Sequence, residues 1–216
     1  MLENKLGITN FLDLAHEEER ITKLKALELF DTNKINEFEV VTTKGLCDIH
    51  KFLFNEIYSF AGEIREVNLA KGNFRFAASM YLKDVLFKID SMPEDTFENI
   101  IKKYIEMNIA HPFREGNGRS TRIWLDMILK NRIGKVIDWS KIDKEEYLLA
   151  MERSPIKDTE ITILLKDALT DKISDREIYM KGIDTSYKYE GYNTYSMDEL
   201  DKWFSFIVLL PSLNVL

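Results

Sequence analysis

The chain has 216 residues, a length that fits one domain with a substantial buried core. Its 30 basic and 37 acidic residues give a net charge of −7, which disfavours binding to nucleic acid or to an anionic membrane surface. The single cysteine, Cys47, excludes an intrachain disulfide, and the first ten residues lack the apolar core of a signal peptide. These features predict a cytoplasmic protein.

Helical periodicity dominates the first part of the chain. Apolar residues recur every three positions over residues 21–30 and every three or four positions over residues 46–60, which is the spacing of amphipathic helices. Over residues 67–76 the pattern changes to alternation, with a turn signal at residues 71–73. This predicts a β-hairpin, and since an isolated hairpin is only marginally stable, we expect it to lie on the rest of the protein.

Two predicted helices in the middle of the chain enclose a polar loop. Residues 97–110 form the first helix, and Pro112 ends it because the residue before a proline avoids the helical conformation. A second apolar stripe predicts a helix over residues 119–130. Residues 116–118, Gly-Asn-Gly, stand at the entrance to that second helix. There the glycines allow a close backbone approach, and free amides favour an anion.

The side chains around this loop suit a bound polyphosphate. Arg119 and Arg122 share one face of the helix's first turn, where a polyphosphate would relieve their mutual repulsion. Glu115 adds a hard oxygen ligand of the kind that holds Mg²⁺ beside phosphates. His111 is the one group here that titrates near neutral pH, so it is the candidate general base.

Other nucleotide and metal motifs are absent from the sequence or incomplete. No P-loop string and no His-Glu-x-x-His string occurs, and the Gly-x-Gly-x-x-Gly pattern fails at Thr121. The two other histidines, His16 and His50, lie on predicted amphipathic helices. We expect them to form framework hydrogen bonds rather than to bind a metal.

Residues 111–122 match the signature of the Fic family, His-Pro-Phe-x-Asp/Glu-Gly-Asn-Gly-Arg-x-x-Arg, at every fixed position. The chain resembles this family over about residues 9–192, with Phe60 in place of the usual tryptophan. The resemblance implies a mainly α fold, a Fic-type helical bundle with one β-hairpin flap over the active-site loop. Family members of this type transfer AMP from ATP to a hydroxyl side chain of a target protein. Relatives that act as kinases carry a lysine where this chain has Gly118, which favours AMP transfer.

The same resemblance implies roles for individual residues. His111 would deprotonate the target Tyr, Ser or Thr, and Glu115 would hold Mg²⁺ between the α- and β-phosphates. Five residues would hold the phosphates of ATP: Gly116, Asn117 and Gly118 as an anion hole, Arg119 at the β-phosphate and Arg122 at the γ-phosphate. In the flap, Lys71 and Gly72 would pair main chain with the target segment, and Phe76 would anchor it.

A second motif lies near the C-terminus. Ser186 and Glu190 are four residues apart and so share a helix face, and Gly191 follows as a stop signal. This resembles Ser/Thr-x-x-x-Glu-Gly/Asn, the inhibitory motif of small one-domain Fic proteins. It implies an inhibitory helix over about residues 183–191, in which Glu190 pairs with Arg122 and takes the arginine that the γ-phosphate needs.

Nearby tyrosines suggest how that inhibition could be relieved. We predict that Tyr192, and after it Tyr187, is a site of self-AMPylation, since the added bulk and charge would keep the inhibitory helix from docking. Residues 1–192 would form the Fic domain, and residues 193–216 a tail of unclear role. The apolar stretch at 203–216 is too short to span a bilayer comfortably.

Helix starts in the C-terminal half carry capping signals. Ser140 with Asp143 resembles a capping box before one helix, and Ser174 with Glu177 opens another. Between them, a helix is predicted around residues 161–169.

The sequence leaves some functional alternatives open. The transferred group could be phosphate or UMP, or the chain could be a non-catalytic module that binds nucleotide or peptide. By resemblance, a type II topoisomerase subunit is the target to examine, and a homo-oligomer is plausible.

Overall fold

The structure is a computed structural model that describes residues 2–72 and 74–209, with the backbone alone for residues 204–209. Within these residues it is mainly helical, and the helices are α1 (Phe11–Asp31), α2 (Thr43–Phe54), α3 (Leu82–Asp90), α4 (Phe97–Ala110), α5 (Asn117–Ile133), α6 (Lys144–Arg153), α7 (Thr159–Asp167), α8 (Arg176–Tyr189) and α9 (Met197–Leu209). Short 3₁₀ turns occur at Lys34–Glu37, Ser79–Tyr81 and Trp139–Lys141. The helix content confirms the fold class that the sequence predicts.

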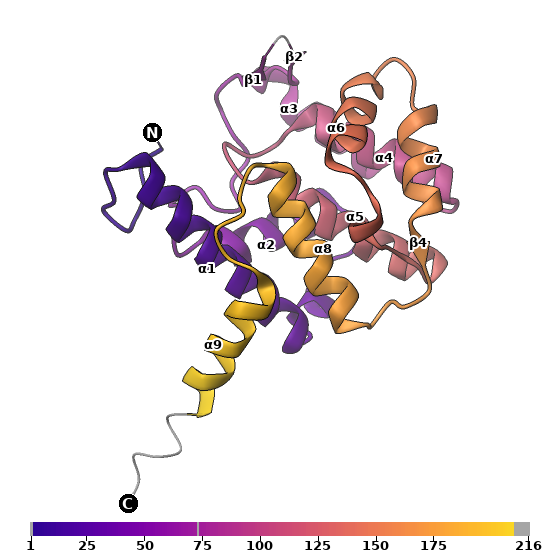
Figure 1. The fold of residues 1–216 in the computed structure, drawn as a ribbon. Helices are drawn as coiled ribbons and strands as arrows, with labels where there is room; N and C mark the ends of the chain where they lie inside the picture. The colour runs from indigo at the N-terminus through magenta and orange to yellow at the C-terminus, as the bar shows by residue number, and fades with distance from the viewer. Residues whose placement is uncertain (1, 73, 210–216) are drawn as a thin grey trace, which may run out of the picture.

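Helix α5 is the centre of the bundle, with α2, α4 and α8 packed around it (Figure 1). Its side chains Ile123, Trp124 and Ile128 are buried, which agrees with the apolar stripe in the sequence. The helix begins after Gly116 and ends before Gly134, and both glycines have the left-handed conformation that other residues adopt at a cost. It is therefore longer than predicted at both ends.

Helix α1 packs against α2, α8 and α9, so the first and last helices of the chain lie against each other. Met197 and Leu200 in the first turn of α9 are buried, while the rest of α9 projects from the bundle (Figure 1). The start of the predicted tail at 193–216 thus packs on the bundle, while residues 210–216 lie outside the described residues.

The hairpin lies where the alternation predicts it. Strands β1 (Ala70–Lys71) and β2 (Phe74–Arg75) pair antiparallel, with Ala70 opposite Arg75. A second short sheet, β3 (Val136–Ile137) with β4 (Leu169–Thr170), was not predicted from the sequence. Because β4 uses residues 169–170, helix α7 ends at Asp167 rather than at the predicted residue 169.

The predicted N-cap residues of two helices were wrong. Asp143 itself caps α6 by accepting hydrogen bonds from two backbone amides, whereas Ser140 donates to Asp138. In the same way Asp175, and not Ser174, caps α8. A carboxylate accepts two amides at once, which makes aspartate a strong cap. Helix α8 begins at Arg176 and so contains most of the predicted inhibitory segment 183–191.

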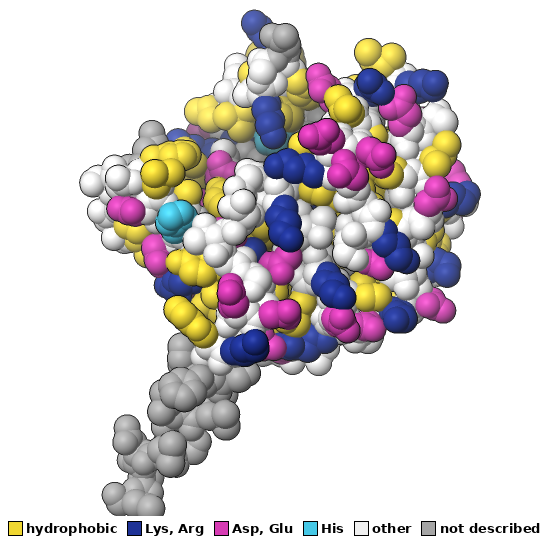
Figure 2. Space-filling view, viewed as in Figure 1, with side chains coloured by type: hydrophobic (Ala, Val, Ile, Leu, Met, Phe, Trp, Pro, Cys, Tyr) yellow, Lys and Arg dark blue, Asp and Glu magenta, His cyan; other side chains and the backbone are white. Residues whose placement is uncertain are grey.

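The surface and the helix lengths bear on possible partners. Among the described helices, none is both long and apolar enough to pass through a membrane. Figure 2 shows Lys and Arg side chains mixed with Asp and Glu side chains across one face, a pattern without a continuous basic stripe on that face.

Candidate active site

The loop between α4 and α5 forms the floor of a cleft of about 920 Å³. The flap, α6 and the end of α8 form the walls of this cleft. Eleven of the predicted site residues line it: Lys71, Gly72, Phe76, His111, Glu115, Gly116, Asn117, Gly118, Arg122, Glu190 and Tyr192. The predicted residues Arg119, Ser186 and Tyr187 are buried and do not line the cleft, but Arg119 contacts Glu190, which does.

His111 ends α4 in a left-handed conformation, with φ of 50°. Its ring stacks on Phe76 of the flap, with the ring centroids 3.6 Å apart. Burial disfavours the charged imidazolium and lowers the pKa of His111 to about 4, although a hydrogen bond to the backbone of Asn108 opposes this. The side chain is therefore neutral at pH 7 and able to accept a proton. Phe76 packs on the candidate base, and its use as an anchor for the target stays a prediction.

Arg65 holds the turn at His111 in place and is a site residue that sequence reasoning missed. Its guanidinium donates to four backbone carbonyls, those of His111 at 2.7 Å, Ala110 at 3.0 Å, Val67 at 2.5 Å and Ala77 at 2.6 Å. It thereby ties the base of the flap to the end of α4. In the sequence, nothing distinguishes Arg65 from the other arginines of the chain.

His50 supports the loop between α4 and α5 through hydrogen bonds. The amide of Gly62 donates to its Nδ1 at 2.8 Å, so Nε2 carries the proton and donates to the carbonyl of Glu115 at 2.9 Å. Burial lowers the pKa of His50 to about 3, so this neutral tautomer persists. The predicted framework role of His50 is confirmed. His16 instead lies exposed on α1, and no partner for it occurs in the part of the chain that the structure describes.

The start of α5 has the form of an anion site. Gly116 is its N-cap residue, and no side chain caps the helix there. The Asn117 side chain bonds to both the amide and the carbonyl of Phe113, at 2.8 and 2.7 Å, and so closes the loop. The first amides of a helix have no intrahelical acceptor, and here they face the cleft floor.

Gly116 is required by both its conformation and its surroundings. Its φ is +72°, and a Cβ atom there would lie 2.3 Å from the ring of Phe54. We expect Gly116→Ala to lower the free energy of unfolding by about 3 kcal/mol, the sum of left-handed strain and overpacking. Gly134→Ala is the matched control, because Gly134 has φ of +63° but open space around it. It should cost about 1 kcal/mol. Equal losses in urea unfolding would contradict the steric argument.

Glu190 pairs with both arginines of the motif. Its Oε1 accepts from Arg122 at 2.6 Å, as the sequence predicts, and its Oε2 accepts from Arg119 at 2.8 Å, which was not predicted. Burial by itself would raise the pKa of Glu190, but the two arginines outweigh burial and lower it. The carboxylate also covers the anion site, since a Cβ atom on Gly118 would lie 2.3 Å from Glu190 Oε1.

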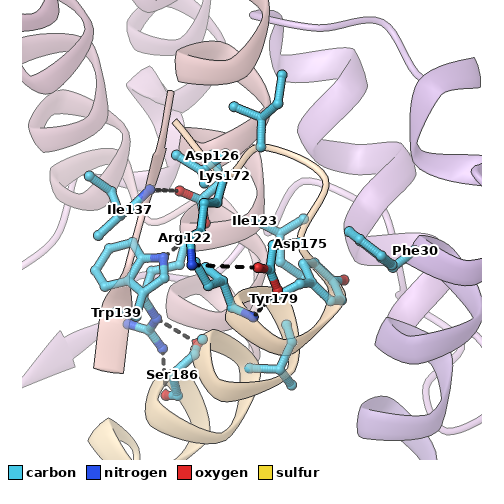
Figure 3. Close-up of a pocket in the computed structure, with 15 residues that line it drawn as sticks. Phe30, Arg122, Ile123, Asp126, Ile137, Trp139, Lys172, Asp175, Tyr179 and Ser186 are labelled. Carbon is cyan, nitrogen blue, oxygen red and sulfur yellow. Dashed lines mark hydrogen bonds and ion pairs between the residues drawn. The ribbon is translucent and has the colours of Figure 1, made fainter. Parts of the chain in front are cut away.

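Ser186 fastens the other side of Arg122. Arg122 donates through Nε to the Ser186 hydroxyl at 2.6 Å and through Nη2 to its carbonyl at 2.9 Å (Figure 3). Figure 3 shows these bonds beside a cavity of about 50 Å³ between α5 and α8. In it the carboxylate of Asp126 accepts from Ile137 and Trp139, and burial raises its pKa to about 7. Sequence reasoning had not singled out Asp126.

The loop and its surroundings match a known family. The model of the Fic/DOC family matches residues 40–129, which contain α2, the flap and the α4–α5 loop. A probable protein adenylyltransferase of Sinorhizobium fredii is 30% identical over 153 residues, which are 57% of this chain and 78% of that protein. The chain belongs to the Fic/DOC family.

Other relatives agree with this assignment. Protein adenylyltransferase VbhT of Bartonella schoenbuchensis is 27% identical over 218 residues. The alignment covers 89% of this chain but only 44% of VbhT. The chain therefore spans less than half the length of this relative. The crystal structure of BepC from Bartonella tribocorum, with bound AMPPNP, has a TM-score of 0.65 to this chain at 20% identity. The structural match covers 79% of this chain and 92% of the BepC chain, and it confirms the Fic fold.

Two tyrosines of this Fic chain, Tyr187 and Tyr192, were predicted as modification sites, and the guanidinium of Arg119 lies over the rings of both. Tyr187 is 1% exposed, so its hydroxyl is reachable only if α8 leaves its place. Tyr192 lines the cleft and donates its hydroxyl to Glu18 at 2.8 Å. Modification of Tyr192 stays a prediction.

As the candidate general base, the buried His111 should set the pH dependence of any transfer reaction in this cleft. In the Glu190→Gly variant, we expect kcat/KM to stay level from pH 8 to about pH 5 and to fall only as the pH approaches the pKa of about 4 at His111. The charge of Glu190 raises the pKa of His111, so its removal shifts the fall to still lower pH. A fall centred near pH 6.5, the ordinary histidine pKa, would contradict this environment for His111.

Proposed function

We propose that the chain is a protein adenylyltransferase that transfers AMP from ATP to a hydroxyl side chain of a target protein. One observation carries the proposal. A neutral His111 stands in the same cleft as an uncapped helix start and the Arg122 guanidinium. A nucleotide-binding module needs the anion site but has no use for the base. The names of the relatives, protein adenylyltransferases, support the same reaction.

The reaction would be a single displacement at the α-phosphorus. His111 accepts the proton of the target hydroxyl, and the hydroxyl oxygen forms a bond to phosphorus as the bond to the β-phosphate oxygen breaks. Diphosphate leaves, and the amides at the start of α5 with Arg119 and Arg122 hold its negative charge. The protein's contribution is thus the base, the orientation and a fixed positive field.

Mg²⁺ is the cofactor that such a site would use. Within the described residues, no group of three or more His, Cys, Asp or Glu side chains could bind a metal by itself. Glu115 nevertheless fits a shared site, since its carboxylate lines the cleft and adjoins the amide of Gly116. Together with phosphate oxygens it would complete the usual Mg²⁺ environment. The ion would neutralise charge on the departing diphosphate.

Autoinhibition by Glu190 is part of the proposal. A phosphate group and the Glu190 carboxylate would compete for the same edges of Arg119 and Arg122. The carboxylate also lies over Gly118, where the phosphates would enter. ATP then binds poorly, or with its α-phosphate away from His111, until the C-terminal part of α8 moves.

The protein target would enter beneath the flap. Lys71 and Gly72 offer main chain for a β-type pairing with the modified segment. By family resemblance, the target to test first is a type II topoisomerase subunit, in the cytoplasm of a bacterial cell. Assembly into a homo-oligomer is a further expectation.

The deciding experiment follows the position of the label in ATP. The Glu190→Gly variant is incubated with Mg²⁺, cell lysate and ATP labelled at the α- or the γ-phosphate. Protein labelled from the α-position alone supports AMP transfer. Label from the γ-position would make the chain a kinase, and a preference for α-labelled UTP would make it a uridylyltransferase. ATP binding without any transfer would leave a binding module.

A further inference from the structure

Arg119 is surrounded by three carboxylates, each on a different nitrogen of its guanidinium. Glu190 accepts from Nε at 2.8 Å, Glu115 lies 3.0 Å from Nη2, and Glu18 lies 2.7 Å from Nη1. Glu115 and Glu190 belong to the family motifs. Glu18 lies on α1, about a hundred positions earlier in the chain and outside both motifs.

Glu18 differs from the other two in its surroundings. It is 2% exposed and lies outside the cleft lining, so an incoming phosphate cannot displace it. Its Oε2 accepts from the hydroxyl of Tyr58, and its Oε1 accepts from Tyr192 at 2.8 Å. Tyr58 thus holds one carboxylate oxygen, and Tyr192 and Arg119 hold the other. Glu18 is therefore a fixed partner of Arg119, whereas Glu190 is the exchangeable one.

Aromatic rings fix the plane of the same guanidinium. Its central carbon lies 4.9 Å from the ring centroid of Phe54 and 4.6 Å from that of Tyr192. The ion pair with Glu18 on one edge and the two rings over its faces leave the Arg119 guanidinium little rotational freedom. The Nε edge, now occupied by Glu190, is the edge that remains for a phosphate.

We infer that Glu18 is a positioning residue for nucleotide binding: it holds Arg119 with its Nε edge toward the cleft, before and after Glu190 withdraws. This inference rests on the proposed function, in which Arg119 contacts the β-phosphate. Glu18 also supplies the charge that balances buried Arg119 when Glu190 leaves. Without it, the guanidinium would lose its fixed direction and turn toward Glu115 or solvent.

The test compares ADP with AMP, since only ADP carries a β-phosphate. In the Glu190→Gly background with Mg²⁺, Glu18→Gln should weaken ADP binding about tenfold and leave AMP binding unchanged, as measured by titration calorimetry. Glu19→Gln is the matched control, because Glu19 is the adjacent and equally buried carboxylate but binds Lys23 and the backbone of Thr194. It should leave the ratio of the two affinities unchanged.

A second variant guards against misfolding of Glu18→Gln. Tyr58→Phe removes one hydroxyl that holds Glu18 and keeps the ring, so the ADP-to-AMP ratio should shift in the same direction by a smaller factor. An unchanged ratio in Tyr58→Phe and in folded Glu18→Gln, or an equal change in Glu19→Gln, would overturn the inference. Failure of the proposed function is a separate result: the Glu190→Gly parent would bind ADP but show no label from the α-position of ATP. A parent that binds no ADP would overturn both.

Discussion

Replacing Glu190 with glycine is expected to raise AMP transfer by about 10²-fold or more. The wild-type carboxylate makes two charge-assisted hydrogen bonds, to Arg119 and Arg122. Each such bond contributes about 1.5–3 kcal/mol, and each 1.4 kcal/mol of competition is about a factor of ten. ATP must displace both bonds in the wild-type chain but neither in the variant. The measurement is the initial rate of α-label incorporation into protein at a fixed ATP concentration.

The control separates the loss of this contact from the loss of any charge on α8. Glu190→Gln keeps the shape of the side chain and should activate by a smaller factor. Glu177→Gln, on the same helix, loses a surface pairing with Lys181 and should not activate. ATP should also raise the Tm of Glu190→Gly more than that of the wild-type protein, because the variant leaves two buried arginines in need of an anion. Equal rates and equal Tm shifts would refute autoinhibition by Glu190.

Replacing His111 with alanine should lower transfer by about 10²–10⁴-fold, the usual contribution of a general base. The ring stacks on Phe76 at the end of α4 and has no part in holding the phosphates in the proposed mechanism, so ATP affinity should change little. The loss is therefore expected in kcat. It is measured as single-turnover transfer in Glu190→Gly with and without His111→Ala.

The matched control for His111→Ala is His16→Ala. His16 is exposed on α1 and should be silent in both rate and affinity. Full transfer activity in the His111 variant would exclude the proposed mechanism. A large loss of ATP affinity with an unchanged kcat would instead assign His111 to binding.

Local sequence was sufficient for the floor of the site. Gly116, His111 and Arg122 lie within twelve residues, and the geometry between them is set by one helix end, one short loop and one helix start. Such geometry depends on backbone preferences that a sequence displays: proline after His111, glycine at the positive-φ position and an apolar stripe beyond. The Ser186–Glu190 spacing was sufficient in the same way, since both residues meet Arg122.

Four contacts required the tertiary structure. Arg119 pairs with Glu18 and Glu190, Arg65 holds the turn at His111, and Phe76 packs on the ring of His111. In each pair the partners lie tens of residues apart. Hydrophobic periodicity shows which face of a helix is buried, but not which neighbour it meets or at what register. The positions of α1, α8 and the flap on α5 decide that, through packing of the whole core.

The sequence by itself therefore determined the family, the fold class and the chemistry of the α4–α5 loop, because these follow from short-range backbone rules and from residues in fixed order. Only the tertiary structure decided which buried charges face one another around Arg119. Ion pairing at full burial depends on distances of a few ångströms between separate helices, and those distances are set by how α1 and α8 pack on α5.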